Sequence, residues 1–176
     1  MLQTILGCII LDSDGERIAS RYYGNYKSNS FMRLCNQLEF EKQLYQKGSK
    51  LAGRNEAEAI FVDEFLCLVY AINDICIYLI SKKSENELIL LDVINCIYGT
   101  LLTVTVNNIS KKSLFENLDS VHLILDEVVD ESGIILETDP RVVYQRIRMQ
   151  GSNALEETSF NQAFTTAKEN IMRSFL

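Results

Sequence analysis

The apolar segment 88–106, LILLDVINCIYGTLLTVTV, constrains the fold of this chain more than any other stretch. It carries a single charge, Asp92, over about the length that a helix needs to cross a bilayer. Asp92 and Asn95 would be costly in lipid, and Ser84 and Glu87 form a capping-box pattern just before the segment. We therefore predict a helix inside a globular domain and not a membrane span.

This predicted helix runs to about Asn107 and is apolar on nearly every side. A helix of this kind must be covered on all sides. One side can lie on a sheet, and another needs either a second helix of the same chain or another protein. The sequence leaves both possibilities open. The apolar residues form two neighbouring stripes: Leu88, Leu91, Ile94, Tyr98 and Leu102, and Ile89, Val93, Ile97, Leu101 and Val104.

Short apolar runs elsewhere predict β-hairpins. Thr4–Leu11 and Arg17–Tyr23 flank Asp-Ser-Asp-Gly, and the runs LCLVYAI and ICIYLI flank Asn73-Asp74. The run AIFVDEF, just before the second pair, adds a further strand. The sequence thus predicts five strands that pair antiparallel with their neighbours in the chain.

Further helices are indicated by capping signals and apolar spacing. The predicted order gives an α+β domain over residues 1–150, with a five-stranded antiparallel sheet flanked by helices, followed by a C-terminal helical tail at 151–176. The signals are Gly48 as a left-handed cap after 31–47, a capping box at Ser113–Glu116 before a helix ending near Asp130, Asp139-Pro140 opening a helix to about Arg148, and an apolar stripe over 160–176.

Charge and cysteine usage exclude several function classes. The formal net charge of −7 argues against a large phosphate- or nucleic-acid-binding surface. The cysteines form no C-x-x-C pair, and their odd number and irregular spacing argue against a disulfide framework or a zinc site. We expect them to be reduced core residues of a cytosolic or nuclear protein. They are Cys8, Cys35, Cys67, Cys76 and Cys96.

The motif IILDSDGE is the strongest indication of an enzyme. In a haloacid-dehalogenase-type phosphatase, Asp12 would be the nucleophile and Asp14 the general acid/base beside Mg²⁺. Glu16 would add charge where a phosphate must sit, and the next segment is an alternating strand, not a helix. A calcium loop lacks two required oxygens, and no nucleophile–base pair surrounds His122. We interpret the motif as a turn and predict no catalytic, cofactor-binding or metal residue.

Several longer stretches carry a resemblance to a known family. They are ILDSDGERIASRYY, FEKQLYQK, AIFVDEFLCLVYAINDICIYLI, ENELILLDVINCIYGTLL, LFENLDSVHLILDEVVDESGIILETDP and AKENI. Together they resemble the longin-like adaptor small chains of vesicle coats, and within that group the zeta subunits of coatomer. The resemblance covers the chain from about residue 4 to its end and implies a longin-like fold.

The resemblance implies a non-enzymatic structural subunit without a cofactor. Such subunits sit in the curve of a large helical solenoid, here the gamma coatomer subunit, within the rest of coatomer. An Arf-type GTPase recruits this complex from the cytoplasm to Golgi membranes and coat vesicles, for retrograde Golgi-to-ER and intra-Golgi transport. Tyr98, Leu101 and Leu102 are the residues that we predict for the partner-facing side of the long helix.

In the related sigma chains of clathrin adaptors, an Arg and several apolar residues bind acidic dileucine signals. Arg17 falls at the matching Arg position and Tyr98 at one apolar position. Asn73 and Asn108 fall where small or apolar residues are expected, so Arg17 is predicted to be a vestige of a degraded cargo pocket. The alternatives are a clathrin-adaptor sigma-type chain and a free-standing longin module that regulates a GTPase or a tether.

Overall fold

The computed structural model describes residues 5–24, 33–49 and 56–149. Its centre is a five-stranded sheet in the order β2-β1-β5-β4-β3, in which every neighbouring pair is antiparallel. The predicted five-stranded antiparallel sheet is therefore confirmed, with strand ends within three residues of those expected. Pairing between chain neighbours does not hold throughout, because β2 and β3 are not paired and β1 pairs with β5 instead. The strands are β1 (Ile5–Asp12), β2 (Arg17–Tyr22), β3 (Glu58–Val62), β4 (Phe65–Ile72) and β5 (Ile75–Lys82).

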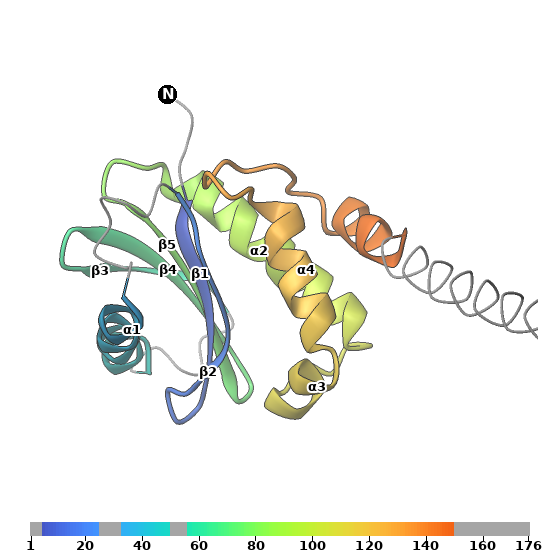
Figure 1. The fold of residues 1–176 in the computed structure, drawn as a ribbon, viewed down its shortest axis with the longest axis horizontal. Coiled ribbons are helices and arrows are strands. Elements are labelled where there is room, and N and C mark those ends of the chain that lie inside the picture. Colours follow the sequence, from blue (N-terminus) through green and yellow to red (C-terminus); the bar gives the residue numbers. More distant parts are fainter. Residues whose placement is uncertain (1–4, 25–32, 50–55, 150–176) are drawn as a thin grey trace, which may run out of the picture.

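Helices cover both faces of this sheet (Figure 1). One face carries α1, and the other carries α2 with α4 beside it, so the described residues form three layers and two apolar cores. The central strands β1 and β5 are buried on both faces, which explains why their sequences are nearly continuous apolar runs. The helices are α1 (Leu34–Gly48), α2 (Glu87–Val104), α3 (Lys111–Glu116), α4 (Leu118–Val128) and a further helix at 140–149.

The Asp-Ser-Asp-Gly motif forms the turn between β1 and β2, as predicted. Asp12 is 1% exposed, and its Oδ1 accepts hydrogen bonds from the backbone N–H groups of Asp14 (2.9 Å) and Glu16 (2.8 Å). Gly15 supplies the positive φ of +83° that this turn requires. Asp12 Oδ2 lies 2.6 Å from Lys111 Nζ at the start of α3. The carboxylate therefore holds the turn and ties it to a distant helix.

The predicted capping boxes are wrong in their details. Asn86, and not Ser84, caps α2 by accepting a hydrogen bond from the N–H of Leu88 (2.9 Å). The box before α3 has Ser110 as the cap and Ser113 as its partner, each side chain bonding to the other's backbone N–H. The single helix expected after Ser113 is divided at Asn117, whose non-helical angles (φ −122°, ψ 31°) end α3 before α4 begins.

The prediction that Gly48 forms a left-handed cap after α1 is also wrong. Gly48 lies within the last turn of α1, and Ser49 caps the helix with right-handed angles. A Cβ atom added at Gly48 would lie 2.5 Å from the hydroxyl oxygen of Tyr78, which is fully buried on β5. The absence of a side chain thus allows close packing of α1 on the sheet, which local sequence cannot reveal.

The helix at 140–149 begins where Asp139-Pro140 predicted it. Asp139 Oδ1 accepts a hydrogen bond from the N–H of Arg141 (2.9 Å), as expected of an N-terminal cap. Val143 and Ile147 on this helix are buried. The predicted C-terminal tail at 151–176 lies outside the described residues, so the proposed division between domain and tail stays a prediction.

Candidate partner-binding surface

The long apolar helix α2 packs its inner side on the sheet. Its buried residues fall on one broad arc: Leu90, Val93, Ile94, Cys96, Ile97, Thr100 and Leu101. The side turned away from the sheet is mostly polar, with Asp92, Asn95 and Thr103 exposed. By length and composition α2 could also span a membrane, but in this fold it serves as the core helix of the sheet.

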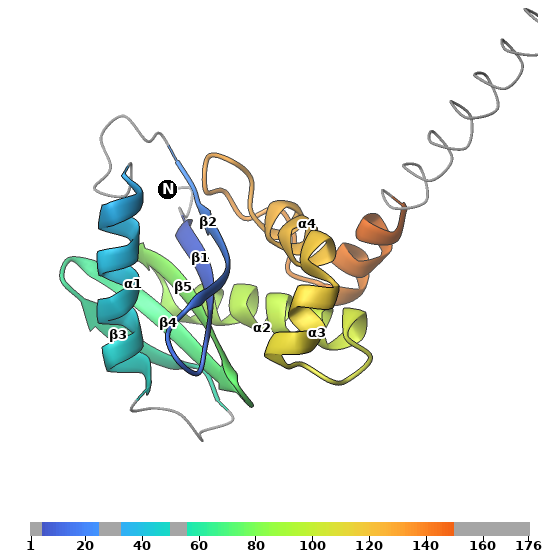
Figure 2. The same cartoon turned by 60° about the horizontal axis from the view of Figure 1, so that its bottom comes forward.

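One flank of α2 is covered by the chain itself. Figure 2 shows α4 and the helix at 140–149 on the same side of α2. Thr100 Oγ1 lies 3.4 Å from the carbonyl oxygen of Pro140, and a Cβ atom added at Gly99 would lie 3.2 Å from the Pro140 ring. Helices of the same chain therefore cover this flank, which is one of the two possibilities that the sequence leaves open.

The opposite flank of α2 faces β4 and is only half covered. The ring of Tyr98 packs on that of Tyr70 of β4, with 4.8 Å between the centroids. Within the described residues, α4 lies on the other side of α2, and no helix lies over this flank (Figure 1). We call this surface the open flank, and it consists of five half-buried apolar residues: Tyr70, Ile72, Leu91, Tyr98 and Leu102.

The predicted partner-facing residues separate into two groups. Tyr98 and Leu102 belong to the open flank, but Leu101 is 0% exposed and points into the core between α2 and the sheet. One residue corresponds to about 100° of helical rotation, so Leu101 cannot share a face with Leu102. The structure removes Leu101 from the surface that a partner could touch, and the role of Tyr98 and Leu102 stays a prediction. Tyr70 and Ile72 of this surface cannot be predicted from the pattern of α2, because they come from a different element.

Arg17 lies on the other face of the sheet, where α1 packs. Its guanidinium donates to the Glu41 carboxylate from Nε (3.0 Å) and from a terminal nitrogen (2.6 Å), and to Gln37 Oε1 (3.2 Å). Glu41 is 2% exposed and also accepts a hydrogen bond from the Tyr22 hydroxyl (2.7 Å). Arg17 therefore bonds within the chain and cannot join Tyr98 in one pocket.

The site where a sigma-type pocket would lie is bridged by hydrogen bonds. Asn73, in the turn between β4 and β5, donates from Nδ2 to the carbonyl oxygen of Ile109 (2.7 Å). The neighbouring Asp74 accepts from the N–H of Lys111 (3.1 Å). These bonds join the β4–β5 turn to the segment between α2 and α3. They support the prediction that this chain does not bind dileucine signals, which stays a prediction.

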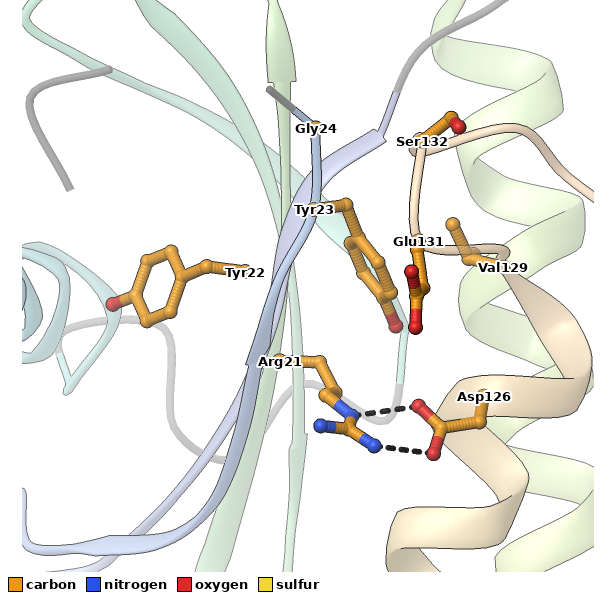
Figure 3. Close-up of a pocket in the computed structure, with 8 residues that line it drawn as sticks. All are labelled: Arg21, Tyr22, Tyr23, Gly24, Asp126, Val129, Glu131 and Ser132. Carbon is orange, nitrogen blue, oxygen red and sulfur yellow. Dashed lines mark hydrogen bonds and ion pairs between the residues drawn. The ribbon is translucent and has the colours of Figure 1, made fainter. Parts of the chain in front are cut away.

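A cleft of about 850 Å³ opens between β2 and α4 (Figure 3). Arg21 and Asp126 meet across it in a two-pronged ion pair, while Tyr22 points to the opposite side of the sheet. The Tyr23 hydroxyl donates to the carbonyl oxygen of Leu125 (2.9 Å). The polar groups of the cleft thus hold α4 on β2, and their arrangement is that of a structural contact.

The described residues offer no arrangement suited to catalysis by a bound metal. Within 5–24, 33–49 and 56–149, no group of three or more His, Cys, Asp and Glu side chains is placed to hold a metal ion. Asp12, the nucleophile of the phosphatase hypothesis, is enclosed by its turn and by Lys111. Burial raises the pKa of the Asp12 carboxyl, whereas the Lys111 ammonium and two backbone N–H groups lower it. The net result is a pKa below the usual range.

Comparison with known proteins agrees with this architecture. The family model described as clathrin adaptor complex small chain matches residues 1–154. Coatomer subunit zeta-2 of Arabidopsis thaliana is 36% identical over 171 residues, which cover 96% of this chain and 93% of the relative. Coatomer subunit zeta-2 of Mus musculus is 36% identical over 176 residues, covering 99% of this chain and 82% of the relative.

A structural comparison supports the same fold. A chain in a homology model of the full-length AP-3 complex in a stretched open conformation superposes with a TM-score of 0.66. The match covers 88% of this chain and 98% of the other at 15% identity, so it concerns the fold alone. With the sheet order, the family match and the relatives in agreement, the chain belongs to the clathrin adaptor complex small chain family, whose members are non-enzymatic structural subunits.

Proposed function

We propose that this chain is the zeta-type small subunit of a coatomer coat. The observation that carries the proposal is the similarity to coatomer zeta subunits over nearly the whole length of both chains. The proposed direct partner is the gamma coatomer subunit, in whose helical solenoid the chain would sit. The complex would be recruited from the cytoplasm to Golgi membranes by an Arf-type GTPase and would act in retrograde Golgi-to-ER and intra-Golgi transport.

The open flank of α2 is the proposed contact with this partner. It presents aromatic and aliphatic side chains without a charge, which suits a stable protein interface better than a nucleic acid or an anionic lipid surface. Residues 91–102 of α2 extend for about 17 Å, a length that a helix of similar size can follow. A second helix laid along this flank would complete the cover that α2 lacks on this side.

The first experiment is an affinity purification of the tagged full chain from cytosol, with the co-purifying proteins identified by mass. A gamma-type coatomer subunit at near-equal stoichiometry, together with the other coatomer subunits, is the expected result. Recovery of adaptins instead would indicate that the chain is a sigma-type small chain. Recovery of the chain without any solenoid subunit would refute the proposed function.

The proposed contact surface is tested with two matched variants. Leu102→Asp places a charge on the open flank and is expected to abolish recovery of the gamma subunit. Leu34→Asp makes the same change at an exposed leucine of α1, on the opposite face of the sheet, and is expected to leave recovery unchanged. Thermal unfolding of both variants shows that they remain folded. If both variants still recover the gamma subunit, the open flank is not the contact.

A further inference from the structure

Two tyrosine side chains meet within the open flank. Tyr70 of β4 and Tyr98 of α2 pack with 4.8 Å between their ring centroids and an interplanar angle of 35°. Both side chains are half-buried, so part of each ring stays open to solvent. The face of such a ring attracts cations, and the hydroxyl group forms hydrogen bonds. This pair therefore offers a partner a more specific contact than the aliphatic residues around it.

A carboxylate lies beside this pair, at the border of the open flank. Glu58 of β3 is in register with Val69 of β4, so Glu56, two residues earlier, lies next to the strand position of Tyr70. Burial, the Tyr98 side chain and the negative charge of Glu56 raise the pKa of the Tyr70 hydroxyl. Glu56 is exposed and forms no ion pair with the residues that the structure describes. Its charge thus acts on the tyrosine pair and is available to a positive group of another molecule.

Aliphatic side chains complete the surface around the two rings. Leu102 follows Tyr98 by one helical turn, and Ile72 follows Tyr70 on the same face of β4. Both aliphatic residues are half-buried against the core. A side chain that suits this surface needs an apolar stem for the aliphatic residues and a positive head for the rings and the carboxylate. Arginine has both parts, since its planar guanidinium can stack on an aromatic ring while it donates two hydrogen bonds to a carboxylate.

We propose that Tyr70, Tyr98 and Glu56 form a subsite for an arginine side chain of the partner helix that lies along the open flank. The inference rests on the proposed function and deepens it, because it names the chemistry of the residue that the gamma subunit presents there. Charge complementarity selects this occupant. The Glu56 carboxylate repels an acidic side chain, and a purely apolar one would take water from this carboxylate without giving it a hydrogen bond in return. Arginine and tyrosine are also the residue types that most often dominate the binding energy of an interface.

The first test measures the Kd of the purified full chain for the purified gamma coatomer subunit of the same organism by titration calorimetry. Glu56→Gln keeps the size of the side chain and removes its charge, and we expect the Kd to weaken by about fivefold to tenfold. Raising the NaCl concentration from about 50 to about 300 mM should weaken the wild-type Kd more than that of Glu56→Gln, because salt screens the lost attraction. Glu64→Gln makes the same change at an exposed position of the turn at the other end of β3. This control is expected to leave the Kd within about twofold of the wild-type value.

Two substitutions at Tyr98 test the aromatic part of the subsite. Tyr98→Phe keeps the ring face, and its Kd is expected to stay within about threefold of the wild-type value. Tyr98→Leu keeps an apolar side chain but loses the ring, and its Kd is expected to weaken by about tenfold. A contact that is only apolar would tolerate leucine as well as phenylalanine. Thermal unfolding of each free variant shows that the chain remains folded.

The outcomes distinguish this inference from the proposed function. If the wild-type chain binds the gamma subunit and Glu56→Gln binds it equally or more tightly, the inference is refuted and the proposed function stands. Equal Kd values for Tyr98→Phe and Tyr98→Leu also overturn the inference, because the contact would then need no ring. If the wild-type chain does not bind the gamma subunit, both are refuted.

Discussion

Removing the carboxylate of Glu41 gives the most direct test of how α1 is held on the sheet. This carboxylate accepts hydrogen bonds from the Arg17 guanidinium and from the Tyr22 hydroxyl at distances between 2.6 and 3.0 Å. Glu41 is 2% exposed and Tyr22 is 7% exposed. Water therefore has little access to the Tyr22 hydroxyl when the Glu41 carboxylate is removed. Glu41→Ala therefore removes the carboxylate that a largely buried guanidinium and a buried hydroxyl both bond to.

The magnitude follows from the cost of breaking a buried ion pair. Removing one partner of such a pair lowers the free energy of unfolding by about 3–5 kcal/mol when the other charge stays buried. Arg17 keeps 24% of its side-chain surface exposed, so partial hydration places the expected loss at the lower end, about 3 kcal/mol. For a chain of this size that loss lowers the Tm by roughly 6–12 °C.

Urea unfolding followed by circular dichroism measures this loss. Glu39→Ala on the exposed side of α1 is the control and is expected to change stability by less than about 0.5 kcal/mol. The double variant Arg17→Met with Glu41→Leu replaces the pair with apolar groups of similar volume and should recover most of the loss. A loss below about 1 kcal/mol for Glu41→Ala would refute the argument that this pair holds α1 in place.

Three further predictions follow from buried or strained positions. The folded-state pKa of Asp12 is lowered, so its stabilising contribution is present above about pH 4 and is lost as the pH falls further. Unfolding midpoints measured between pH 3 and 7 should show this loss of stability in the wild type and a smaller loss in Asp12→Asn. Gly15→Ala, with a positive φ and a Cβ atom 2.8 Å from the Tyr45 ring, should lower the free energy of unfolding by about 1–3 kcal/mol in a urea titration. Ellman's reagent should titrate Cys35 quickly and the other thiols only after unfolding, because burial raises the pKa to about 12 at Cys8 and Cys67 and to about 11 at Cys96.

The pattern of apolar residues predicted the sheet well. Hairpin strands are local, since both strands and their turn lie within about twenty residues, and burial on one or both faces leaves a direct mark on the sequence. The turn at Asp12–Gly15 is an example, because the Asx bonds and the positive φ are made by the motif's own residues. Element boundaries were less accurate, as the shift of the caps from Ser84 to Asn86 and from Ser113 to Ser110 shows.

The candidate surface could be predicted only in part. The sequence predicted that α2 is apolar on nearly every side, whereas the side turned away from the sheet is mostly polar, and the sequence could not say which flank is covered internally. That depends on where α4 and the helix at 140–149 pack, and on the contact of Pro140 with Gly99. The burial of Leu101 is not predictable from α2 alone, because tertiary packing and not composition decides which side of the helix faces the core.

By itself, the sequence determined the strands and their hairpins and the turn at the Asp-Ser-Asp-Gly motif, because each is recorded in residues that are close together in the chain; the pairing of β1 with β5 came only from the tertiary structure. Only the tertiary structure decided that Arg17 bonds to Glu41 on one face while Tyr98 meets Tyr70 on the other. These pairings join residues far apart in the chain. The geometry of these contacts depends on how whole helices and strands pack, and it cannot be predicted from the periodicity of any single element.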